Sequence, residues 1–404
     1  MSAGISEVSG GVTAPQGFVS GGLYSGIRKV KKDLAIILSD RPATAAGVFT
    51  LNKTKAACVV IDQQQLHASS VCSAIVVNSG NANACTGERG TADAWTMIEE
   101  TARALALPKE RVLVSSTGVI GQYMPMEKVV PGIRTLAGQL DRDGHAAAAE
   151  AIMTTDTHPK ESAVRFTAGG ASITIGGMAK GSGMIAPNMA TMLAFVTTDA
   201  VIGAAALQSA LRRANERSFN RITVDGDMST NDMALLLANG AAGNAEIRER
   251  SPEFEVFTAA LERVMVTLGK MIARDGEGAT KLVEVHVTGA RTEEEGAQAA
   301  RAVANSNLVK TAIHGADANW GRILAALGYS GIEFNPDVVE IGFNGLPVLK
   351  KNYAIVLDEE KAKAILEQEN IVVQIDLHQG TADAKFWTCD LTKEYVHINA
   401  SYRS

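Results

Sequence analysis

The segment from Lys180 to Ala200, KGSGMIAPNMATMLAFVTTDA, restricts the fold of this chain most strongly. A Gly-rich loop passes Pro187 and leads through Thr191 into the apolar run 192–196, which predicts a buried strand. A polar Thr at the start of such a strand has two interpretations. It is an ordinary strand residue, which is the more frequent case, or it is a hydroxyl nucleophile with small neighbours that leave room for attack on a carbonyl. The segment alone leaves both open.

The composition is that of a globular protein. Hydrophobic residues make up 46% and charged residues 20% of the 404 residues, and the formal net charge is −6. This balance supports buried cores, and the lack of a basic excess argues against a nucleic-acid partner. The length predicts two or three subdomains, or one large two-layered body.

Cysteine usage and hydropathy indicate a cytoplasmic protein. Residues 1–26 lack the basic and apolar regions of a signal peptide, and no apolar run reaches the roughly 18 residues of a membrane-spanning helix. We therefore expect no membrane partner. The chain has four cysteines, none in a CxxC pair or at zinc spacing, which we expect to be reduced thiols: Cys58, Cys72, Cys85 and Cys389.

The pattern of apolar residues alternates between strands and helices and predicts an α+β fold. Short strands are expected at 33–39, 46–50, 57–61, 74–77, 111–115, 338–343, 371–377, 383–388 and 394–399, with a hairpin at 163–176. Helices are expected at 91–107, 126–139, 144–153, 203–218, 253–273, 293–305 and 359–368.

Three loops carry candidate functional groups. Thr117 and Gly118 follow a predicted strand, and a hydroxyl beside an unobstructed backbone N–H could donate to an oxyanion, although Thr-Gly pairs are usually only turns. Glu277 lies between two glycines, which suits the binding of an ammonium group. The segment 225–232 holds three Asp but neither a downstream Glu nor a nearby His, so we expect turn and capping roles and no metal.

A nucleophilic Thr needs a base, and the familiar catalytic motifs are missing: the sequence has no GxSxG, P-loop, dinucleotide-binding GxGxxG or HExxH pattern. A Thr obtains a base when it becomes a chain N-terminus, because its own α-amino group titrates at about 7.7–8.0. Cleavage between Ala190 and Thr191 would create that terminus, with the Thr hydroxyl attacking the Ala190 carbonyl and water opening the ester. Local chemistry allows this step without requiring it.

Six blocks resemble the ornithine acetyltransferase family of arginine biosynthesis. They occur in the family's order and extend over nearly the whole chain, down to the tail INASYRS. The blocks are NSGNANACTG at 78–87, SSTGVIG at 115–121, GSGMIAPNMATML at 181–193, TVDGDMSTND at 223–232, ARDGEGATK at 273–281 and GADANWGRI at 315–323.

This resemblance implies an α/β/β/α sandwich of two packed sheets, with a self-cleaving, N-terminal-nucleophile-like architecture. Cleavage would give an alpha chain of residues 1–190 and a beta chain of residues 191–404, associated as a dimer of the pairs, a heterotetramer. The activity implied is ping-pong transfer of acetyl from N2-acetyl-L-ornithine to L-glutamate through acetyl-Thr191. No cofactor is implied. Some members also use acetyl-CoA as a donor, and the residues do not separate the two kinds.

Site roles carry over by position. Thr117 and Gly118 would form the oxyanion hole beside the nucleophile Thr191. The family often ends in Thr, and the hydroxyl is kept at Ser404 here. Two alternatives stay open: a self-cleaving amidohydrolase or aminopeptidase of the same architecture, and a binding protein without catalysis. The implied substrate-binding residues are Thr154, Lys180, Thr191, Glu277, Asn399 and Ser404.

Overall fold

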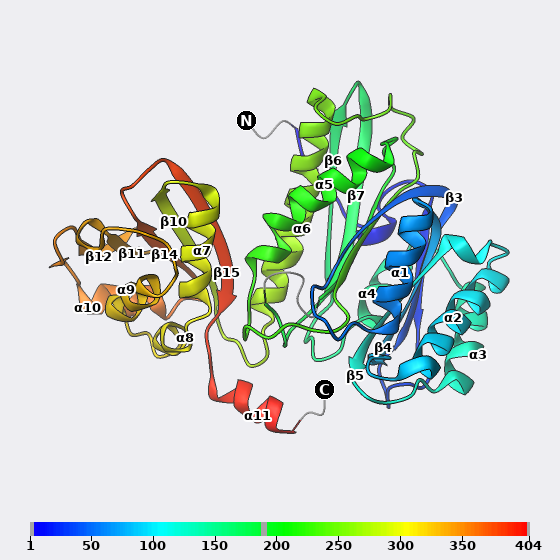
Figure 1. Ribbon diagram of the computed structural model, residues 1–404, viewed down its shortest axis with the longest axis horizontal. Helices are drawn as coiled ribbons and strands as arrows, with labels where there is room; N and C mark the ends of the chain where they lie inside the picture. Colours follow the sequence, from blue (N-terminus) through cyan, green and yellow to red (C-terminus); the bar gives the residue numbers. More distant parts are fainter. Residues whose placement is uncertain (1–3, 187–191, 402–404) are drawn as a thin grey trace.

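The computed structural model describes residues 4–186 and 192–401 and forms two sheets surrounded by helices (Figure 1). The predicted α+β class, built from two sheets with helices, is confirmed. The predicted cleavage residues Ala190 and Thr191, and the predicted contact Ser404, lie outside the described residues. The division into chains after residue 190 stays a prediction.

The larger sheet carries the segment with which the sequence analysis began. Strand β7 ends at Lys180 and pairs antiparallel with β8, which in turn runs parallel to β9. In the described residues its nine strands take the order β1-β6-β7-β8-β9-β3-β4-β5, with β2 on β3. The strands are β1 (Ser6–Glu7), β2 (Phe18–Leu23), β3 (Leu34–Phe49), β4 (Val71–Asn81), β5 (Val112–Val119), β6 (Lys160–Ala168), β7 (Ala171–Lys180), β8 (Leu193–Thr198) and β9 (Met233–Ala238).

Helices cover this sheet in two groups. The first group packs on strands β2 to β5, and the second, α5 with α6, packs on β3, β6 and β7. Each group closes an apolar core of Ala, Val, Ile and Leu side chains against the sheet. The helices are α1 (Ala57–Ala68), α2 (Gly87–Ala104), α3 (Met126–Ala137), α4 (His145–Ala151), α5 (Ala204–Glu216) and α6 (Pro252–Arg274).

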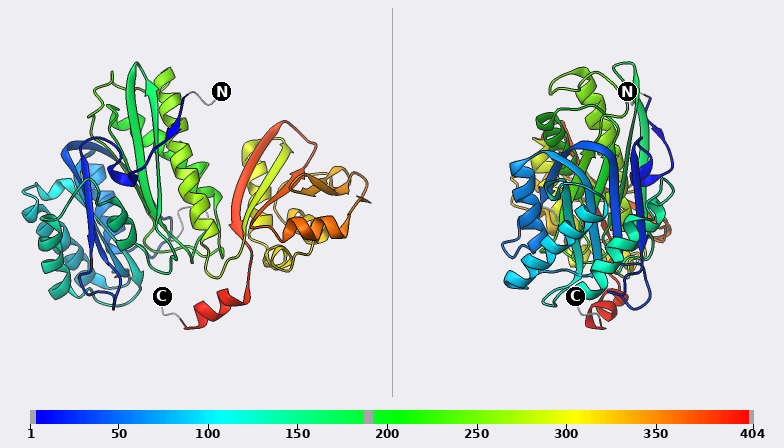
Figure 2. Two further views of the ribbon diagram at one scale, coloured as in Figure 1. Left: turned by 180° about the vertical axis from the view of Figure 1, so that it is seen from behind. Right: turned by 90° about the vertical axis from the view of Figure 1, so that its right-hand side faces the viewer.

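The smaller sheet belongs to a C-terminal body with its own core. Helix α6 lies between the two sheets and contacts β6 and β7 on one side and β10 and β15 on the other (Figures 1 and 2). This body contains β10 (Leu282–Ala290), β11 (Glu340–Phe343), β12 (Leu346–Lys350), β13 (Ala354–Ile355), β14 (Asn370–Asp376), β15 (Ala382–Cys389), α7 (Glu293–Ala304), α8 (Asn307–His314), α9 (Trp320–Gly328) and α10 (Glu359–Leu366).

The last helix, α11 (Lys393–Ser401), runs from the end of β15 back beneath the larger body (Figures 1 and 2). The predicted strand at 394–399 is therefore wrong. Alternating apolar residues suggested a strand, but no strand of the described residues pairs with them. The Thr392 hydroxyl accepts a bond from the Glu394 N–H at the helix start over 3.2 Å.

Two other strand predictions need correction. Residues 57–61 open helix α1, because Cys58, Val59, Ile61 and Asp62 bury one helical face against the core. The separate strands at 33–39 and 46–50 are one strand, β3, which bends at a break in its register with β4 between Leu38 and Ala43. Among the described residues, no helix is long and apolar enough to cross a membrane.

Candidate active site

A pocket of about 600 Å³, open to solvent, lies where β5 and β7 end and β8 and β9 begin. It gathers residues from seven separate segments of the chain, and every described residue for which the sequence analysis gave a site role is among them. The lining residues are Ala82, Thr117, Gly118, Ile120, Thr154, Thr155, Lys180, Gly183, Met184, Ser229, Thr230, Asn231, Glu277 and Asn399.

Thr117 and Gly118 end strand β5 on one side of this pocket. Gly118 pairs with Gly80 of β4 and has φ +135°. A Cβ at Gly118 would meet the Gly80 carbonyl carbon at 2.3 Å, so only glycine fits this close approach of two backbones. The hydroxyl of Thr117 and the N–H of Gly118 are thus held at the pocket wall by a strand pairing that admits no side chain.

The Asn-rich segment at the end of β4 supports this wall through side-chain to main-chain bonds. The Asn78 amide donates to the Asn81 carbonyl (2.8 Å), and the Asn81 side-chain oxygen accepts from the Asn83 N–H (2.8 Å). The Asn83 amide donates to Gly90 in α2 over 2.7 Å. Because Ala82 itself lines the pocket, the segment has a structural role and also faces the site.

Lys180 places a buried cation at the pocket, with its side chain only 2% exposed. Burial lowers its pKa, and the nearby Asp156 charge opposes that shift. Burial alone would raise the pKa of Asp156, but the charges of Lys180 and Lys160 hold it below its usual range. Asp156 is therefore an anion, and its charge favours the charged form of Lys180.

Asp156 also fixes two backbone segments of the pocket. Its carboxylate accepts from the Thr154 N–H (2.9 Å), the Gly181 N–H (2.7 Å) and the Lys160 ammonium (2.7 Å). Lys160 reaches Asp275, at the end of α6, over 2.6 Å. These buried ion pairs connect the chain around Thr154, the Gly-rich loop and the segment that leads to Glu277.

Glu277 enters the pocket opposite Gly183. Its N–H donates to the Ser182 carbonyl (3.0 Å), and its Oε2 accepts from the Asn399 amide of α11 (2.8 Å). A Cβ at Gly183 would lie within 2.5 Å of the Glu277 carboxyl atoms, so this glycine makes room for the carboxylate. Glu277 and Lys180 give the pocket one negative and one positive group.

Asp225 holds the Gly-rich loop rather than capping a helix. Its two carboxylate oxygens accept from the Met184 N–H (2.7 Å) and the Ile185 N–H (2.9 Å), and burial raises its pKa. The Val224 N–H in turn donates to the Ile185 carbonyl over 2.8 Å. The backbone of Met184 and Ile185, just before Pro187, is thus held by hydrogen bonds to both Asp225 and Val224.

Sequence reasoning gave no role to several pocket residues, namely Ser229, Thr230 and Asn231 before β9 and Thr155 after α4. The first three belong to the TVDGDMSTND block, whose likeness to the family was noted without assigning them a function. Their signal was a run of polar residues directly before a buried strand.

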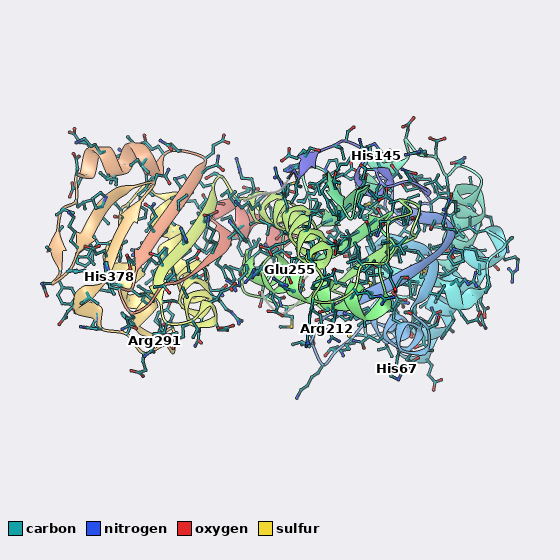
Figure 3. The ribbon with its side chains drawn as sticks, turned by 90° about the horizontal axis from the view of Figure 1, so that it is seen from above. His67, His145, Arg212, Glu255, Arg291 and His378 are labelled. Carbon is teal, nitrogen blue, oxygen red and sulfur yellow. The ribbon has the colours of Figure 1, made fainter. Side chains whose placement is uncertain are left out.

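The histidines lie elsewhere. Figure 3 shows His67 and His145 on the larger body and His378 on the C-terminal body. All seven fall within the described residues, and none lines this pocket.

Comparison with known proteins identifies the family. The model of the ArgJ family matches residues 19–404. The arginine biosynthesis bifunctional protein ArgJ of Symbiobacterium thermophilum is 54% identical over 400 residues, covering 98% of this chain and 99% of that protein. Its counterpart in Geobacillus kaustophilus is 50% identical over 395 residues, covering 98% and 96%.

A crystal structure of ArgJ from Bacillus halodurans is 48% identical, with a TM-score of 0.50, and covers 52% of this chain and 98% of the solved one. The family indicated by the six sequence blocks is thereby confirmed, and this chain belongs to the ArgJ family.

Proposed function

We propose that this chain is a glutamate N-acetyltransferase that takes acetyl from N2-acetyl-L-ornithine and passes it to L-glutamate in arginine biosynthesis. The bifunctional ArgJ name of its relatives supports the general role. The observation that carries the finer proposal is the pocket beside the start of β8, which gathers Thr117, Gly118, Lys180 and Glu277. Strand β8 begins at Leu193, two residues after Thr191 in the sequence.

The proposed activation is self-cleavage. The Thr191 hydroxyl attacks the Ala190 carbonyl, the peptide C–N bond breaks, and an ester with a free Thr191 amine forms. Water then hydrolyses the ester and leaves the Ala190 carboxylate and the Thr191 hydroxyl. The new amine, with an ordinary pKa of about 7.7–8.0, accepts the hydroxyl proton near neutral pH.

The proposed transfer is a ping-pong exchange. Thr191 Oγ attacks the acetyl carbonyl, and the resulting oxyanion accepts bonds from the Thr117 hydroxyl and the Gly118 N–H. Ornithine leaves with the proton, and the glutamate amine then attacks the acetyl ester. Lys180 suits a substrate carboxylate and Glu277 an ammonium, with Thr154, Asn399 and Ser404 as further contacts. The reaction needs no cofactor.

The test begins with mass spectrometry of the purified protein. We expect two chains, 1–190 and 191–404, associated as a dimer of pairs by size measurement, and one uncleaved chain in Thr191→Ala. N-Acetylornithine is then supplied with and without glutamate. Acetylglutamate formed in step with released ornithine supports transfer, and ornithine release that ignores glutamate would identify a hydrolase. A wild-type chain that stays whole and inactive would identify a binding protein.

Acetyl-CoA is a second proposed donor, because the relatives are named bifunctional. Incubation of the cleaved enzyme with acetyl-CoA and glutamate should then release free thiol. If the enzyme transfers acetyl from N-acetylornithine but releases no thiol from acetyl-CoA, it only recycles acetyl from N-acetylornithine to glutamate.

A further inference from the structure

Both polar atoms of the Asn231 side-chain amide form hydrogen bonds within the larger body. Its Nδ2 donates to the Ala82 carbonyl over 2.7 Å and to the Ser116 carbonyl over 2.8 Å. Its Oδ1 accepts from the Thr230 hydroxyl over 2.6 Å. The residue lines the pocket and is 4% exposed, so these bonds are shielded from water.

Both carbonyls that Asn231 holds flank the proposed oxyanion donors. The Ser116 carbonyl belongs to the planar peptide unit that leads into Thr117, so fixing that oxygen sets the direction from which Thr117 projects. The Ala82 N–H donates to the Val119 carbonyl over 3.0 Å, just beyond Gly118. Asn231 is therefore bonded to the backbone on both sides of the Thr117–Gly118 pair, at Ser116 and at Ala82.

On its other side Asn231 continues into β9, the strand beside β8. The Met233 N–H donates to the Met192 carbonyl (3.3 Å), and Leu193 pairs with Met233 in the parallel ladder. Asn231 precedes Met233 by two residues, as Thr191 precedes Leu193 in the sequence. One short segment thus contacts both the oxyanion wall and the strand that follows the nucleophile.

We propose that Asn231 is a positioning residue that fixes the Thr117–Gly118 donors relative to the Thr191 strand. The inference rests on the proposed function. Under the proposed cleavage, Asn231 belongs to the beta chain, while Ala82 and Ser116 belong to the alpha chain. The bonds of Asn231 to the Ala82 and Ser116 carbonyls would then align the oxyanion donors of the alpha chain with the nucleophile of the beta chain. A misplacement of catalytic groups on the order of 1 Å costs about 10²-fold in rate.

Asn244 offers a matched control far from the pocket. Its amide donates to the Val201 carbonyl (3.0 Å) and the Ala245 carbonyl (2.7 Å), and its oxygen accepts from the Val201 N–H (2.8 Å). It makes the same kind of bonds as Asn231 but lines no part of the site. Replacing each by Ala separates the cost of losing a bonded amide from the cost of misplacing catalytic groups.

The test compares acetyl transfer from N-acetylornithine to glutamate in wild type, Asn231→Ala and Asn244→Ala. We expect Asn231→Ala to lower kcat about 10²-fold, near the loss of one oxyanion donor, with KM changed by less than about threefold. Asn244→Ala should keep the wild-type kcat. An inactive wild type would defeat the proposed function, whereas an active wild type with equal kcat in both variants would overturn the role of Asn231 alone.

Asn231→Asp keeps the shape if the Ala variant does not fold. An ionised Asp would face two carbonyl oxygens and donate to neither, while a protonated one regains one bond. We expect its kcat, relative to wild type at the same pH, to rise as the pH falls from 8 to 6. A flat ratio across this range would contradict the positioning role.

Discussion

The side-chain amide of Asn399 donates a hydrogen bond to Oε2 of Glu277 over 2.8 Å, and this contact brings the C-terminal helix to the pocket. No residue of α11 is buried. A second contact comes from the Tyr395 hydroxyl, which donates to Asp225 over 3.2 Å. A helix with so little packing is positioned by these polar contacts, so its effect on the site should be separable from folding.

Asn399→Ala should therefore weaken substrate binding more than it slows chemistry. Glu277 would lose its neutral donor and the end of α11 its anchor, at a cost of about 1.5–3 kcal/mol for a bond to a charged group. We expect KM for N-acetylornithine to rise about 10- to 150-fold, the equivalent of that energy, with self-cleavage unchanged. Val396→Ala, on the same helix and 65% exposed, is the control. A KM equal to that of the control would contradict a role for α11 in binding.

Gly183→Ala tests the position of the Glu277 carboxylate without changing its charge. The new Cβ would lie within 2.5 Å of that carboxyl group, whose flexible end must move away. We expect Gly183→Ala to raise KM in the wild-type background. In a Glu277→Gln background it should raise KM little further, because both changes remove the same contact between the Glu277 carboxylate and the substrate. Gly328→Ala, with nothing within 4 Å of its new Cβ, is the neutral control. Additive effects would show that the two residues act separately.

Thr117→Ala should lower kcat about 10²–10³-fold, the loss typical of one oxyanion donor. Thr117→Ser keeps the hydroxyl and should recover most of the rate. Steady-state acetyl transfer measures both variants, and near-equal losses in the Ala and Ser variants would point to packing of the Thr methyl group instead of its hydroxyl.

Much of the fold could be predicted from the sequence because many segments carry strong periodic patterns. The hairpin at 163–176 and helices such as α3 and α6 lie where they were expected. Predictions were wrong where local and tertiary preferences compete. The run Ala57–Ile61 has strand-forming residues but lies in a helix. Helix α11 alternates like a strand, but none of the strands in the described part of the chain pairs with it.

The site could be named in part from the sequence, since the family blocks point to Lys180 and Glu277 by position. What the sequence could not supply is the three-dimensional support. Asp275 bonds Lys160 across 115 residues of chain, and Asn231 reaches Ser116 across an equal separation. Such contacts between distant segments leave no local pattern.

The buried Lys160 should be essential to the stability of this support. It bonds Asp156 (2.7 Å) and Asp275 (2.6 Å), and its side chain is fully buried. Lys160→Met would remove the cation that bonds both carboxylates and leave only the charge of Lys180 near Asp156, and we expect a loss of about 3–5 kcal/mol in the free energy of unfolding. Lys109→Met breaks an exposed pair with Glu99 and should cost at most about 1 kcal/mol. Urea unfolding measures both, and equal losses would contradict the argument.

Asp62 predicts a pH dependence of stability that has nothing to do with catalysis. It is fully buried behind β5, where its Oδ1 accepts from the Val114 N–H (3.0 Å) and its Oδ2 has no partner among the described residues. Burial raises its pKa well above the usual range. The folded chain then keeps a proton that the unfolded chain loses above a pH of about 4, so this group's contribution falls as the pH rises from there toward the folded pKa.

Asp62→Asn removes that titration while keeping the shape of the side chain. Its free energy of unfolding should fall less steeply with rising pH than that of wild type, by up to about 1.4 kcal/mol per pH unit above pH 4. Urea unfolding at several pH values between 4.5 and 7 measures the difference. Asp143→Asn, at an exposed position, should follow the wild-type slope. If Asp62→Asn also follows it, Asp62 is ionised in the folded protein, and the raised pKa inferred from its burial is wrong.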